Sequence, residues 1–164
     1  MVAELHRVPV RAQLGALRDG SVTPLEAVQH YLARIERLNP LLGALVEVTP
    51  REAGERAAAG GFERTPLAGL PFADKDLVAR AGVATRYGSR AFADNVPTVS
   101  DELATALDDA GGISLGKTNT PEFGMTGYTE SRVAPPARDP WDTDLGAGGS
   151  SGGAAVAVVT GMLP

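Results

Sequence analysis

Residues 67–76 of the chain read LAGLPFADKD, an apolar run that ends in a charged triplet. Short apolar runs bounded by turn residues are typical of buried strands, so the pattern predicts a strand over Leu67–Phe72. Lys75 would then stand at the end of this strand, with Asp74 and Asp76 turned to the opposite side by strand alternation. A lysine partly buried there would lose solvation of its charged form, which lowers its pKa as a lysine base requires.

Helix and strand signals alternate on both sides of this stretch. The best marked helix starts at Thr23, Pro24 and Glu26, which supply the N-cap, the first helical residue and a capping box. Further helices are predicted over residues 10–17, 49–59 (with a second capping box, Thr49 and Glu52), 101–109 (capped by Ser100), 120–126 and 154–160, and strands over 44–48 and 113–115. The expected apolar faces are Leu25, Val28, Leu32 and Ile35 in the helix after Thr23, and Leu103 with Leu107 in the helix over 101–109. This alternation, in a chain of 164 residues, predicts one α/β domain.

The composition excludes several classes of function. The net charge of -5 provides no excess of positive charge to bind a polyanion, so nucleic acid is not an expected partner. The absence of cysteine excludes a disulfide framework, a thiolate metal site and a cysteine nucleophile, and His6 and His30 are too few for a multi-histidine metal centre. Neither histidine has a ligand neighbour at a suitable spacing, so surface or core roles are expected for both. We expect no metal and no cofactor.

No membrane attachment is predicted. The start of the chain shows no basic-then-apolar leader, and the longest apolar run, Ala154–Leu163, is too short to cross a bilayer. A cytoplasmic protein is therefore expected.

Residues 111–118, GGISLGKT, match the phosphate-loop pattern of nucleotide-binding proteins. That loop follows a buried strand and opens a helix at its Gly-Lys pair, so that backbone N–H groups surround the phosphates. Here a helix is predicted before the segment and a strand in its middle. A strand followed by a turn fits better, and nucleotide binding stays a third alternative.

Residues 148–153, GGSSGG, contain the nucleophile-elbow pattern G-x-S-x-G around each of two serines, Ser150 and Ser151. A Ser-His-Asp triad of the α/β-hydrolase kind needs a histidine after the serine, and none follows here. Glycines flanking two serines before an apolar helix instead favour close backbone approach and unusual peptide geometry.

Six motifs occur together in one order along the chain. They are LAGLPFADKD (67–76), RYGS (86–89), LGKTN (115–119), EFGM (122–125), DPWD (139–142) and GGSSGG (148–153). In this order and at these separations they resemble the amidase signature family, serine hydrolases that use a Ser-Ser-Lys triad. The resemblance implies an α/β fold with helices packed around a mixed β-sheet. The TPEFG version of residues 120–124 looks more like general bacterial amidases than like the subunit of the tRNA-dependent amidotransferase that shares this signature.

The resemblance also implies roles for particular residues. Lys75 matches the family's base, and Ser150 matches the serine that follows a cis peptide bond and relays a proton to and from the nucleophile. Ser151 would support the loop by hydrogen bonding, paired glycines including Gly149 would leave room for the cis bond, and Met125 would form a wall of the acyl pocket. Asp74 departs from the family, which usually has an apolar residue there, so the electrostatics around the relay are open.

In the family, the acylating serine and the glycines of the oxyanion hole lie beyond the segment that ends here at Pro164. We therefore expect residues 1–164 to be the amino-terminal part of one amidase-signature domain, inactive alone, whose complete form hydrolyses small-molecule carboxamides through an acyl-enzyme. An apolar surface meant for the missing strands should be exposed, which predicts a homo-oligomer or pairing with a complementary amidase segment. The alternative is a non-catalytic paralogue, or a split-enzyme piece, that binds a partner chain.

Overall fold

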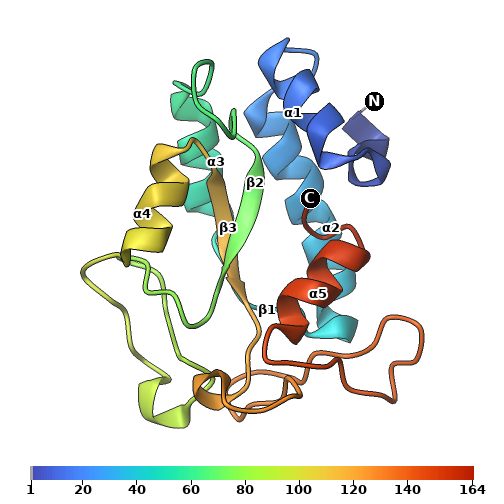
Figure 1. The fold of residues 1–164 in the computed structure, drawn as a ribbon, viewed down its shortest axis with the longest axis vertical. Coiled ribbons are helices and arrows are strands. Elements are labelled where there is room, and N and C mark those ends of the chain that lie inside the picture. Colours follow the sequence, from blue (N-terminus) through green and yellow to red (C-terminus); the bar gives the residue numbers. More distant parts are fainter. Residues whose placement is uncertain (1) are drawn as a thin grey trace.

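A three-stranded sheet forms the centre of the computed structural model, which describes residues 2–164 (Figure 1). Its strands are β1 (Leu45–Val48), β2 (Pro71–Lys75) and β3 (Ile113–Thr118). β3 lies between the other two, antiparallel to β1 and parallel to β2. The sheet is therefore mixed, and the α/β class expected from the alternation of elements is confirmed.

Five α-helices and three 3-10 turns accompany the sheet in the described residues. They are η1 (Val2–Arg7), α1 (Val10–Arg18), α2 (Pro24–Leu42), α3 (Pro50–Ala59), η2 (Arg90–Phe92), α4 (Glu102–Asp109), η3 (Glu122–Gly124) and α5 (Gly152–Val159). The long connections from β2 to α4 and from β3 to α5 gather at one end of the sheet (Figure 1). That end carries the carboxyl termini of the parallel strands β2 and β3, where open α/β sheets bind their ligands.

The start of α2 follows the predicted capping box. Thr23 Oγ1 accepts the N–H of Glu26 at 3.2 Å, and the Glu26 carboxylate accepts the N–H of Thr23 at 2.8 Å. Val28 and Ile35 are buried, as predicted, and Leu32 is partly buried. Leu25 is 37% exposed, so the prediction that it belongs to the apolar face was wrong. The buried face of α2 contains Ala27, Val28, Tyr31 and Ile35.

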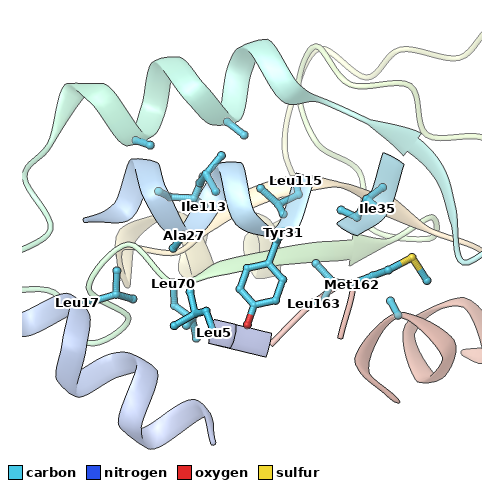
Figure 2. Packing of buried hydrophobic residues seen from close by; sticks show 14 of the residues in the cluster. Leu5, Leu17, Ala27, Tyr31, Ile35, Leu70, Ile113, Leu115, Met162 and Leu163 are labelled. Carbon is cyan, nitrogen blue, oxygen red and sulfur yellow. The ribbon is translucent and has the colours of Figure 1, made fainter. Parts of the chain in front are cut away.

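The core forms where α2 meets the sheet and the end of the chain. Figure 2 shows Tyr31 and Ile35 among Ile113, Leu115 and Met162, all of them buried. The Tyr31 hydroxyl donates to the buried Gln13 side chain at 2.8 Å, so the polar tip of this ring does not lie unpaired in the core.

α5 is fixed beside α2 by Arg34 (Figure 1). The guanidinium of Arg34 donates to the backbone carbonyls of Thr160 and Gly161, just after the helix ends. A cation at this position satisfies carbonyls that a helix leaves without partners.

Two predicted caps do not form. Thr49 lies before α3 with φ -118° and ψ 64°, and its side chain makes no cap hydrogen bond, so the second capping box was wrong. α4 begins after Asp101 rather than Ser100, because the Ser100 hydroxyl accepts the N–H of Ala81 from a neighbouring loop. In α4 the buried residue is Ala104, while Leu103 is 57% exposed.

The helix predicted over residues 120–126 is also wrong. The segment forms only the short turn η3, because Phe123 and Gly124 both have positive φ, at 50° and 68°. Left-handed residues cannot continue a right-handed helix. Two strands differ in extent: β2 begins at Pro71 rather than Leu67, and β3 continues through Gly116, Lys117 and Thr118, so the Gly-Lys pair of the phosphate-loop pattern lies inside a strand.

His6 and His30 meet although 24 residues separate them. Their ring nitrogens Nδ1 and Nε2 lie 3.1 Å apart, and the ring planes stack with centroids 5.2 Å apart. Within residues 2–164 no group of three or more metal-ligating side chains occurs, and no helix is long and apolar enough to cross a membrane.

Candidate active site

Lys75 meets the two serines of residues 148–153 where β2 ends. Its Nζ lies 2.8 Å from Ser150 Oγ and 2.9 Å from Ser151 Oγ. The structure thus brings together three of the side chains that the sequence singled out. The peptide bond between Gly149 and Ser150 is cis.

The serine loop is held at both ends by Thr129. The buried Thr129 hydroxyl donates to the Gly148 carbonyl at 2.8 Å and accepts the N–H of Gly152 at 3.0 Å. Thr120 Oγ1 donates to the Ser150 carbonyl at 3.2 Å. These contacts fix the backbone on either side of Ser150, and a rigid backbone keeps its hydroxyl at a constant distance from Lys75.

Gly149 has a steric reason to be glycine. A Cβ at this position would stand 2.8 to 2.9 Å from the backbone of Tyr128, which runs against the serine loop. Ala147 and Gly148 bond to the same run of chain, through Thr129 and Tyr128. The glycine therefore permits the close approach of two backbones next to Ser150.

Burial lowers the pKa of the Lys75 ammonium. The cause is desolvation, because the charged amine loses water on entering the protein while the neutral amine loses much less. A lowered pKa raises the fraction of neutral lysine near pH 7, and only the neutral amine can accept a proton. This direction agrees with the expectation from the sequence.

Asp74 and Asp76 point away from Lys75, as strand alternation predicts. Asp74 accepts hydrogen bonds from Arg80 Nε at 2.7 Å and Ser114 Oγ at 2.8 Å. Asp76 is fully buried and accepts the backbone N–H of Arg86, while burial raises the pKa of its carboxyl group. One face of β2 thus carries the lysine and the other carries two carboxylates.

A second lysine, Lys117, lies on the carboxylate face. It is fully buried and its ammonium donates to the backbone carbonyl of Val78. Burial lowers the pKa of Lys117, and the carboxylates of Asp74 and Asp76 oppose that shift. Lys75 and Lys117 are the two lysines of the chain, and they occupy neighbouring strands with opposite surroundings.

A cavity of about 660 Å³ opens beside the serine loop. Its lining includes Pro121 and Tyr128, and Tyr128 bridges to Gly148. Met125 lies after η3 in the same part of the chain and is 82% exposed. Its role as a wall of the acyl pocket stays a prediction.

Sequence reasoning missed Thr129, Arg80 and Lys117 as parts of this region. Thr129 stands in an irregular segment without a motif, so no sequence signal could have found it. For Arg80 the sequence held a weak indication, because Asp74 departs from the family pattern and a buried carboxylate needs a cation nearby. Lys117 was quoted in the phosphate-loop pattern and in the LGKTN motif, but neither pattern gave it a role of its own.

With this geometry in place, comparison with known proteins identifies the class. The family model described as Amidase matches residues 26–164. The chain therefore belongs to the amidase family, the amidase-signature hydrolases. This confirms the resemblance stated from the motifs.

Individual relatives are similar over almost the whole chain. It is 37% identical to an acylamidase of Rhodococcus erythropolis over 98% of its length, and 37% identical to a glutamyl-tRNA(Gln) amidotransferase chain of Alkalilimnicola ehrlichii, also over 98%. It covers 35% and 34% of those two proteins. The chain thus spans about a third of the length of the curated relatives that it matches.

Solved structures agree with this assignment. A bacterial aryl acylamidase of the amidase signature family superposes with a TM-score of 0.87 at 32% identity, over 96% of this chain and 34% of that one. The corresponding chain of the Thermotoga maritima glutamyl-tRNA(Gln) amidotransferase superposes with a TM-score of 0.79 at 28% identity, over 97% and 33%. Both kinds of relative share the fold, so the fold does not separate the amidases from the amidotransferases.

Proposed function

We propose that Lys75 and Ser150 are the base and the proton relay of an amide hydrolase. The observation that carries this proposal is the distance of 2.8 Å between Lys75 Nζ and Ser150 Oγ, combined with the lowered pKa of the lysine. A hydroxyl within hydrogen-bond reach of a neutral amine can pass a proton to it directly.

The relay works in both directions. As a nucleophilic serine attacks the amide carbonyl carbon, its hydroxyl proton passes to Ser150 Oγ and the Ser150 proton passes to Lys75 Nζ. The new C–O bond gives a tetrahedral oxyanion. When the C–N bond then breaks, the same path returns a proton to the leaving nitrogen, so that the amine departs neutral and an acyl-serine remains. Water repeats the cycle on the acyl-serine and releases the carboxylic acid.

The nucleophilic serine and the oxyanion hole are proposed to come from sequence beyond residue 164. The relatives are about three times as long as this chain, which supports this part of the proposal. On α5, Val158 and Val159 are 55% and 52% exposed, which favours packing of a further protein segment against this helix.

The proposed substrate is a small linear amide, after the acylamidase and aryl acylamidase among the relatives. The test is hydrolysis of an acyl anilide by the full chain as its gene encodes it. Lys75→Ala and Ser150→Ala should each reduce kcat by about 10²-fold or more, and the double variant should lose little beyond the worse single one, because the two groups act as a unit.

Ser151→Ala and Ser21→Ala are the matched controls. Ser151 also contacts Lys75 Nζ and should give a smaller loss, whereas Ser21 bonds Asp19 in a distant turn and should give none. Full activity in Lys75→Ala would refute the proposed base.

A second candidate function is that of a binding module, favoured by the exposed valines of α5. Residues 1–164 alone should not hydrolyse the anilide under either function. Mixing with a separately produced segment that carries the remaining family motifs separates the two: a split enzyme gains activity in the mixture, and a non-catalytic paralogue forms a complex without activity.

A further inference from the structure

We propose that Arg80 is a positioning residue for Lys75: by pairing with Asp74, it cancels a negative charge that would otherwise hold Lys75 as an ammonium ion. The inference rests on the function proposed above, since it concerns how Lys75 is kept ready to act as a base. It assigns a role to a pair of residues that the relay itself does not use.

The Asp74–Arg80 pair is buried directly behind Lys75. Asp74 precedes Lys75 in β2, and its side chain is 1% exposed, while that of Arg80 is 14% exposed. Arg80 Nε and Nη2 lie 2.7 and 3.3 Å from the two carboxylate oxygens of Asp74, and Ser114 Oγ donates to the same carboxylate. A pair this well bonded and this little hydrated is screened weakly by solvent, so its charges act on their neighbours.

The charges behind β2 balance. Two carboxylates, Asp74 and Asp76, flank Lys75 in sequence on the opposite face, and two cations, Arg80 and Lys117, lie among them. Two formal negative charges thus lie against two formal positive charges in this layer. With these charges offset, desolvation is the effect that lowers the pKa of Lys75.

Two further carboxylates face this layer from the neighbouring helix α4 and the residue before it. Asp108 lies 2.7 Å from Arg80 Nη1 but is 42% exposed, and Asp101 accepts the N–H of Ala79 at an exposed position. Water screens both, so Asp74 is the carboxylate whose charge Arg80 must offset.

Removing one member of the pair exposes the charge of the other. At roughly 10 Å and an effective dielectric constant of about 20, one uncompensated charge shifts a pKa by about one unit, a tenfold change in the ratio of neutral to charged lysine. Loss of Arg80 leaves a carboxylate that stabilises the Lys75 ammonium. Loss of Asp74 leaves a guanidinium that destabilises it.

The test is an NMR titration of the Lys75 Cε resonance in the full chain, labelled with ¹³C-lysine and assigned by its loss in Lys75→Arg. Arg80→Met should raise the Lys75 pKa by about one unit, Asp74→Asn should lower it by a similar amount, and the double variant should return it to the wild-type value. The acid limb of the pH profile for anilide hydrolysis should move by the same amounts.

A merely structural role predicts another pattern. If Arg80 and Asp74 only hold the loop together, both single variants move the Lys75 pKa in the same direction and the double variant does not restore it; that result, or no movement in either variant, overturns the inference. If Arg80→Met does not fold, Asp74→Asn alone tests the inference: a lowered Lys75 pKa supports it, and a raised or unchanged pKa overturns it. The pKa is read without turnover, so a failure of the proposed base in the Lys75→Ala assay is a separate result.

Discussion

The segment over residues 10–59 and the segment over residues 60–164 are held together by different forces. The first consists of α1, α2, β1 and α3, joined by apolar side chains along helix stripes and by one good capping box. The second depends on buried polar groups, among them Asp74, Asp76 and Lys117, and on backbones in direct contact. The difference teaches that the first segment should tolerate substitutions, whereas the second holds polar side chains in fixed positions and should tolerate few.

The largest expected effect on stability comes from replacing one glycine by alanine in each segment and comparing the two variants. Gly116→Ala should destabilise the protein by about 2–5 kcal/mol, because φ is +141° and the new Cβ would stand 2.1 Å from the Glu47 carbonyl oxygen. Gly54→Ala, in α3, meets no atom within 4 Å and should stabilise by about 0.5–1 kcal/mol through helix propensity. Urea unfolding of the two variants checks the opposite signs, and similar effects would remove the contrast between the segments.

The next effect separates the two lysines. Lys117→Met should cost about 2–3 kcal/mol, because it removes the donor to the Val78 carbonyl and a cation between two buried carboxylates. Lys75→Met should change the free energy of unfolding by less than about 1 kcal/mol, since Lys75 is only partly buried and bonds to two serine hydroxyls. Thermal unfolding measures both; equal losses would mean that Lys75 is structural as well.

A smaller effect tests the capping of the helical segment. Thr23→Ala should cost about 1 kcal/mol, because the Thr23 hydroxyl accepts the N–H of Glu26. Thr49→Ala should cost almost nothing, since Thr49 makes no cap hydrogen bond at the start of α3. Urea midpoints of the two variants check this, and a loss in Thr49→Ala as large as in Thr23→Ala would show that α3 is capped in solution.

The smallest effect is a pH dependence at the contact between η1, which carries His6, and α2 of the first segment, which carries His30. Burial lowers the pKa of both His6 and His30, and nearby charges add to it: Arg34 for His6, and chiefly His6 for His30. As the pH falls, the histidines of the unfolded chain take up protons at pH about 6.5, before those of the folded protein do. The contribution of the neutral histidine pair to the free energy of unfolding is therefore present above pH about 6.5 and is lost below it.

The urea concentration at the unfolding midpoint should therefore decrease as the pH is lowered from 7.5 to 5.5. The double variant His6→Gln, His30→Gln should show a flatter profile over the same range. A profile unchanged by that variant would assign the pH dependence to other groups, such as Asp76, whose carboxyl pKa is raised.

The two segments also differ in how well the sequence predicted them. The helices over 10–18 and 24–42 follow from apolar periodicity and caps, which are local signals. The turn at Phe123 and Gly124 was predicted as a helix, because nothing local shows that the backbone becomes left-handed there. Contact with Tyr87, whose carbonyl accepts the Phe123 N–H at 2.8 Å, is a tertiary effect.

For the candidate site, motifs pointed to Lys75, Ser150 and Ser151, and the structure brings these three side chains together. The sequence could not predict Thr129 as the residue that ties the serine loop at both ends. The stacking of His6 on His30 was equally out of reach, since the contact joins two elements whose relative placement depends on the whole core.

The contact between Lys75 and Ser150 joins positions 75 residues apart, and Arg34 holds the end of α5 across 127 residues. At a synthesis rate of about 5–20 residues per second, a ribosome needs roughly 4 to 15 s to travel from the codon of Lys75 to that of Ser150. During that interval the lysine is an ordinary solvated amine, fully protonated at neutral pH. The neutral form of Lys75 can therefore be favoured only late in biosynthesis, once Ser150 and the glycine-rich loop around it have been made and burial lowers the pKa of the lysine.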